Sequence, residues 1–165
     1  MPCKCKDLPQ FAIIRMTECG EVIGHFEEVR RRGDPQWWLD ASQCRSCGTF
    51  WLKAQEERQN DIILLRRLSQ AQADQIQREN QWPPEFDQYE TLLRLGHEAG
   101  YRASFIDPLK ASSVAWTIGD LARQRPGIKV SEIAQLLNLD LKTAAVLVDK
   151  AVVEHDLNID RESES

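Results

Sequence analysis

Residues 1–58 carry short apolar runs separated by polar residues and turn signals, a pattern typical of β-strands. The run at 11–16 is apolar, and the stretch at 20–34 alternates weakly before a Gly-Asp-Pro turn signal. Aromatic residues in the segments at 36–43 and 48–55 favour strands there too. We therefore expect a small antiparallel sheet at the start of the chain.

Beyond residue 60 the pattern turns helical. A segment at 61–69 connects the two regions, and its aliphatic residues need burial although their periodicity leaves the backbone state open. Ser69 is a suitable N-cap for a helix that the prolines at 83 and 84 must end. A second amphipathic helix runs from there to about Gly100, and a turn is expected near Asp107.

Residues 130–152 fit a helix-turn-helix pattern closely. Ser131 is the expected cap of its first helix, the small Ala134 allows the two helices to approach each other, and Asn138 suits the turn between them. The second helix and its end, residues 141–157, contain two lysines and three acidic residues. A segment with this net negative charge repels phosphate. We therefore expect this motif to serve packing or protein contact rather than DNA reading.

Four cysteines have the spacing of a metal site. Cys44 and Cys47 form a C-x-x-C-G knuckle, and Cys3 and Cys5 form a closer C-x-C pair. Four thiolates around one Zn²⁺ leave no open coordination position, so such an ion is structural rather than catalytic. A redox-active pair and merely buried thiols are the alternatives, and Cys19 is a further candidate ligand in place of Cys3 or Cys5.

These patterns give an α+β fold. They predict a zinc-ribbon-like β domain at 1–60, a helical connector at 61–108, a helix-turn-helix-like helical domain at 109–158 and a flexible tail at 159–165. No phosphate-binding loop, nucleophile elbow or metalloprotease motif is present, so we expect no enzyme.

Composition and charge restrict the class of protein, its location and the kind of partner that we expect. Charged residues make up 28% of the chain and hydrophobic residues 42%, as in globular proteins, and no apolar run is long enough to span a membrane. The first residues lack a secretory pattern, which favours a cytoplasmic location. The net charge is −5 and no segment is strongly basic, which suits a basic protein partner better than nucleic acid.

One stretch of the predicted sheet is a candidate surface for that partner. Trp37 and Trp38 are adjacent, so on a strand they face opposite sides and one of them points outward. An exposed aromatic side chain beside Arg30, Arg31 and Arg32 would be a good anchor for a protein partner.

The layout resembles that of small bacterial immunity proteins, the companions of polymorphic and contact-delivered toxins. The resemblance covers about residues 1–100, and the segments at 37–58, 64–69 and 82–93 carry it together with the N-terminal C-x-C pair. It implies a non-catalytic protein that neutralises or escorts a toxin, with the helix-turn-helix region as an addition. The alternative is a transcriptional regulator that combines a zinc ribbon with a DNA-binding helix-turn-helix.

Overall fold

A computed structural model describes residues 3–59, 61–101, 108–110 and 112–162 of the chain. These residues form two compact units, Met1–Glu57 with Asp61–Leu92, and Arg58–Asn60 with Leu93–Ser165. The turn expected near Asp107 lies outside the described residues. Of the described helices, none has the length and apolar content that crossing a bilayer requires.

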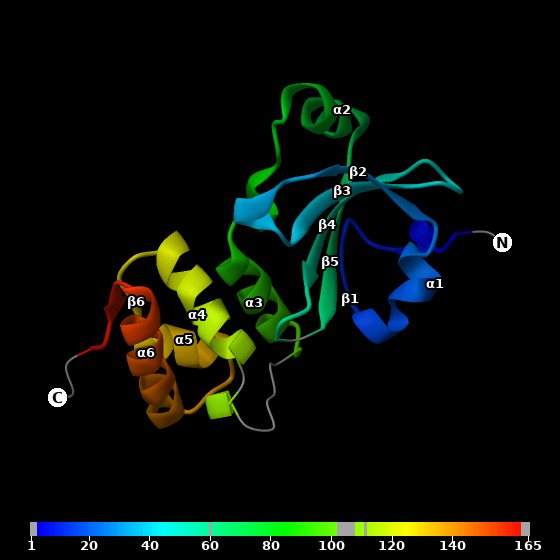
Figure 1. The fold of residues 1–165 in the computed structure, drawn as a ribbon. Helices are drawn as coiled ribbons and strands as arrows, with labels where there is room; N and C mark the ends of the chain where they lie inside the picture. The colour runs from blue at the N-terminus through cyan, green and yellow to red at the C-terminus, as the bar shows by residue number, and fades with distance from the viewer. Residues whose placement is uncertain (1–2, 60, 102–107, 111, 163–165) are drawn as a thin grey trace. The chain divides into compact units, whose positions relative to one another are not determined.

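The first unit is built on a five-stranded antiparallel sheet in the order β1-β5-β4-β3-β2, which confirms the α+β fold and the antiparallel sheet (Figure 1). Its strands are β1 (Phe11–Arg15), β2 (Phe26–Arg31), β3 (Leu39–Cys44), β4 (Phe50–Glu56) and β5 (Ile62–Leu68). The helical segments of this part of the chain are η1 (Cys5–Asp7), η2 (Met16–Glu18), α1 (Cys19–Ile23), η3 (Asp34–Gln36), α2 (Gln70–Glu79), η4 (Pro84–Phe86) and α3 (Tyr89–Glu98).

Two segments of this unit differ from the sequence expectations. The connecting segment at 61–69 contains β5, which pairs with β1 on one side and β4 on the other. Ile62, Ile63, Leu64 and Leu65 are all buried, so both faces of the strand are covered and the apolar run shows no alternation. The stretch expected to begin a strand at residue 20 forms α1 instead, because Cys19, Val22 and Ile23 have helical spacing and pack together against the sheet.

Each face of the sheet carries its own core. On one face, Trp51 and Leu65 pack with residues of the N-terminal segment and α1. On the other face the ring of Phe86, in η4, lies 6.2 Å from that of Phe11, and Tyr89 at the start of α3 donates a hydrogen bond to the buried Glu56. The sheet is thus the middle layer of the first unit.

In the residues that the structure describes, the second unit is helical apart from two short strands. It contains η5 (Pro108–Lys110), α4 (Ser112–Gln124), β6 (Ile128–Lys129), α5 (Val130–Leu136), α6 (Leu141–His155) and β7 (Ile159–Asp160). Both α4 and α5 pack against α6. Strand β7, which falls in the segment expected to be a flexible tail, pairs in parallel with β6.

Helix caps explain where several of these elements begin. Asp140 caps α6 by accepting a hydrogen bond from the Thr143 amide, and Asn138 takes the expected left-handed conformation, with φ 54°, in the turn before it. Ser131 is not the cap of α5, which begins at Val130. Its hydroxyl and amide donate instead to the Glu162 carboxylate.

Ser69 is the N-cap of α2 as the sequence predicts. Its hydroxyl accepts from the Gln72 amide, and the Gln72 side chain accepts from the Ser69 amide, so the two residues form a capping box. We expect Ser69→Ala to lower the free energy of unfolding by about 1 kcal/mol, since the orphan amide loses its partner. Chemical denaturation measures this. Gln77→Ala, at an exposed position of the same helix, is the control and should change it by less than about 0.5 kcal/mol.

Candidate metal centre

The C-x-x-C pair lies in a tight turn between two strands. Cys44 is the last residue of β3, Cys47 lies in the turn, and β4 begins at Phe50. Gly48 has φ 79°, a backbone conformation that favours glycine, and its amide donates to the Cys44 carbonyl at 2.8 Å. The turn is closed by the Cys44 amide, which donates to the Thr49 carbonyl at 2.9 Å. A strand-turn-strand of this kind is the setting of a metal knuckle, not of a helix-opening redox motif.

The C-x-C pair is held against the same sheet by Arg67. Cys5 opens η1, and the guanidinium of Arg67, on β5, donates to the carbonyls of Cys5 and Leu8 at 3.0 and 2.9 Å. The Arg67 amide also donates to the Gln10 carbonyl at 2.9 Å. These bonds tie the N-terminal segment to the sheet at three points. The position of the C-x-C pair is therefore determined by Arg67 on β5 as well as by the pair's own turn.

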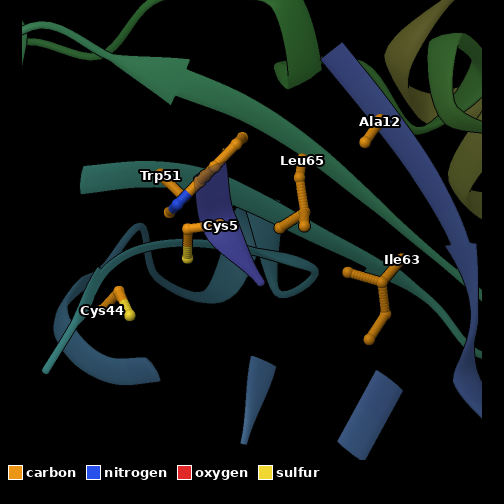
Figure 2. Packing of buried hydrophobic residues seen from close by; sticks show 6 residues of the cluster. All are labelled: Cys5, Ala12, Cys44, Trp51, Ile63 and Leu65. Carbon is orange, nitrogen blue, oxygen red and sulfur yellow. The ribbon is translucent and has the colours of Figure 1, made fainter. Parts of the chain in front are cut away.

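The four predicted ligands come together. The sulfur atoms of Cys3, Cys5, Cys44 and Cys47 all lie within 4.8 Å of one another. A tetrahedral zinc ion with Zn–S bonds of about 2.3 Å places its sulfurs about 3.8 Å apart, so the cluster fits one such ion with small adjustments. Figure 2 shows Cys5 next to Trp51 and Cys44 farther from the ring; both cysteines belong to the apolar cluster and are fully buried.

The outer half of the cluster is open to solvent. Cys3 is half-buried and Cys47 is exposed. Burial raises the pKa of the Cys5 thiol. Burial also acts to raise the pKa of Cys47, but hydrogen bonds with Thr49, Cys3 and Cys44 outweigh it and lower that pKa to about 6. The exposed Cys47 therefore loses its thiol proton more readily than an ordinary cysteine does.

Cys19 does not belong to this group. Among the described residues the sulfur cluster consists of the other four cysteines, and Cys19, at the start of α1, is half-buried and packs against the neighbouring apolar side chains. The C-x-C pair thus provides two of the four sulfurs, and the structure gives no role in the cluster to the fifth cysteine.

Most of the residues predicted to contact a partner make contacts within the protein instead. Trp37 and Trp38 lie in a turn before β3 rather than on a strand, so they do not face opposite sides of the sheet. Their rings pack edge to face at 5.5 Å, and both lie within 5.5 Å of the Tyr89 ring. Trp38 is 2% exposed and donates to the Phe86 carbonyl at 2.8 Å. The Trp38 side chain is therefore enclosed by the protein's own core.

The three arginines of that stretch differ from one another. Arg30 donates to the carbonyls of Ile76 and Gln77 in the last turn of α2, each at 3.1 Å, where a cation complements the helix dipole. The Arg32 guanidinium lies over the Trp82 ring, 5.7 Å from its centre. Arg31 is exposed and pairs with Glu28 at 3.0 Å. Of the three, Arg31 is the one open to a partner.

Two features of the structure were not identified from the sequence. Arg67 supports the cysteine cluster, yet no local pattern distinguishes it from Arg66. The second is the outward side of α6, where Leu141, Val146 and Val153 are 60, 50 and 86% exposed. The helical periodicity of the sequence indicated which side of α6 is buried. Aliphatic residues that fall outside that buried pattern were the signal that could have revealed an apolar outward side.

Comparison with protein-family models, with curated proteins and with solved structures finds no significant match to this chain.

Proposed function

We propose that Cys3, Cys5, Cys44 and Cys47 bind one structural Zn²⁺ that fixes the N-terminal segment to the sheet. The proximity of the four sulfurs supports this. Four thiolate donors favour zinc over harder cations such as Mg²⁺ or Ca²⁺, which take oxygen ligands. Because every coordination position is then filled by protein, the ion contributes stability and no catalytic water.

The whole chain, on this proposal, is a non-catalytic protein-binding module. The observation that carries it is the outward side of α6, where three aliphatic side chains are at least half exposed. Solvent-facing aliphatic groups cannot hydrogen-bond to phosphates or base edges, so they favour a protein partner over DNA. Trp116 on α4, 63% exposed, adds a large aromatic side chain to the same helical unit.

The charge of the C-terminal part of the chain indicates the kind of partner. Residues 146–162 contain five acidic side chains and two basic ones, a balance of −3. One of the basic residues, Arg161, pairs with Asp149 at 2.8 Å. Exposed aliphatic side chains in a net acidic part of the chain are complementary to a basic protein surface. This agrees with the resemblance to immunity proteins, whose nuclease toxins are often basic, and we infer that the partner is a toxin domain that the chain neutralises or escorts.

The test uses the protein encoded immediately upstream of this chain's gene. We expect that protein to be a toxin that the full chain binds in a one-to-one complex and inhibits, as measured by calorimetry and by rescue of growth. Val153→Lys should weaken the complex by about 30-fold or more, the effect of losing an interface residue worth about 2 kcal/mol. Because Val153 is 86% exposed, the substitution leaves the fold intact.

Gln77→Lys is the matched control, since it adds the same charge at an exposed position of α2. It should bind the partner within about twofold of the unsubstituted chain, the range of a surface change away from an interface. No binding of the upstream protein, together with a salt-sensitive shift of duplex DNA by the full chain, would replace this proposal with the DNA-binding alternative.

A further inference from the structure

The Trp51 ring contacts an aromatic side chain and a guanidinium. The ring of Phe26 stacks on it at 6.2 Å with an angle of 17° between the planes. The guanidinium of Arg67 lies over it, 4.7 Å from the ring centre. The side chain is fully buried, and its neighbours in the apolar cluster include Cys5 and Cys44.

The indole N–H of Trp51 is buried and has no hydrogen-bond partner among the described residues. Leaving a buried hydrogen-bond donor unpaired costs about 1–3 kcal/mol of stability, so we expect this N–H to have an acceptor in the folded protein. In Figure 2 the nitrogen lies on the edge of the ring toward Cys5. Cys5 belongs to the same buried cluster, and a thiolate accepts a hydrogen bond far better than a thiol does.

We propose that the Trp51 indole N–H donates a hydrogen bond to the Cys5 thiolate of the zinc centre, and that Trp51 and Arg67 together stabilise the charge of that centre. The inference rests on the zinc site proposed above. Zn²⁺ with four thiolates carries a net charge of −2, and half of this centre is buried. The Arg67 guanidinium supplies one positive charge and fixes the Cys5 carbonyl, while Trp51 supplies the donor to sulfur. Both are positioning residues, since neither would bind the metal.

Such outer-shell groups have a measurable effect on metal retention. Loss of a hydrogen bond to a metal ligand weakens metal binding by about 10–100-fold. We expect Trp51→Phe to release Zn²⁺ to a chromogenic chelator about tenfold faster or more. With Co²⁺ in place of zinc, the sulfur-to-cobalt charge-transfer absorption should move to lower energy, because a thiolate with fewer hydrogen bonds is a stronger electron donor.

Two matched controls separate this effect from packing. Trp38→Phe removes the same atoms and an indole N–H from a buried side chain that bonds to Phe86 on the other face of the sheet. Arg67→Lys keeps the charge but removes the planar guanidinium, which lies over the Trp51 ring while it bonds the two carbonyls. Arg66→Lys makes the same change at the neighbouring residue, which lies over Phe11. Trp51→Phe and Arg67→Lys should accelerate zinc release, and the two controls should not.

Equal release rates and equal Co²⁺ spectra for Trp51→Phe and Trp38→Phe would overturn the inference and leave the zinc site standing. Faster release from Trp51→Phe without the spectral shift would overturn it too, since that result assigns Trp51 to packing alone. An unsubstituted chain that binds neither Zn²⁺ nor Co²⁺ would contradict the proposed zinc site itself.

Discussion

Replacing Cys44 and Cys47 together by serine is expected to abolish zinc binding and to unfold the first unit at room temperature. Structural zinc contributes about 10–16 kcal/mol of apparent binding free energy in small zinc domains, as much as the whole free energy of unfolding of a typical protein. The loss also frees the N-terminal segment, whose Cys5 side chain is part of the buried cluster around Trp51. Metal analysis, near-ultraviolet circular dichroism and a thermal melt measure the result.

Cys19→Ser is the control for this double substitution. Cys19 is half-buried and lies outside the four-sulfur cluster, so we expect the variant to keep one zinc ion per chain and to melt within a few degrees of the unsubstituted chain. Treatment of the unsubstituted chain with a strong chelator should reproduce the melt of the double variant. If the double variant instead kept its zinc, or if Cys19→Ser lost it, the assignment of ligands would be wrong.

The second large effect is expected at Trp38. Its side chain is 2% exposed, packs against Trp37 and Tyr89 and donates to the Phe86 carbonyl, so Trp38→Ala removes packing and a hydrogen bond at once. We expect the free energy of unfolding to fall by about 3–5 kcal/mol, the usual cost of deleting a buried aromatic side chain. Denaturant unfolding followed by tryptophan fluorescence provides the measurement.

Arg31→Ala is the comparison for this prediction. Arg31 belongs to the same stretch of sequence but is exposed, and an exposed ion pair such as that with Glu28 contributes little. We expect its effect on stability to stay within about 0.5 kcal/mol. A Trp38→Ala variant as stable as Arg31→Ala would show that the Trp38 side chain is not buried against Trp37 and Tyr89 in solution.

The cysteine cluster and most of the strands were predictable because their signals are local. The C-x-x-C-G spacing determines a turn, and residue types at 11–16 and 48–55 mark strands whatever surrounds them. The state of residues 62–68 could not be predicted from periodicity, because burial on both faces of β5 depends on which strands lie beside it. The same limit applies to Trp37 and Trp38, whose turn is stabilised by Tyr89 from a distant segment.

The role of Arg67 in holding the N-terminal cysteine segment could not be predicted from the sequence either. Arg66 and Arg67 are identical in type and adjacent, yet alternation along β5 places them on opposite faces of the sheet. Only the register of β5 with β4, which pairs Arg67 with Trp51, brings one of them to the cysteine segment. Long-range pairing therefore determines which arginine serves the site, and the composition of the strand alone does not.

The central claim is that four cysteine sulfurs hold one zinc ion in this chain, and zinc-edge X-ray absorption spectroscopy tests it most directly. We expect protein purified with zinc to contain one ion per chain and to show four sulfur neighbours at about 2.3 Å, with no nitrogen or oxygen neighbour in the first shell. A chain that retains no zinc, or a first shell with fewer than four sulfurs, would contradict the account.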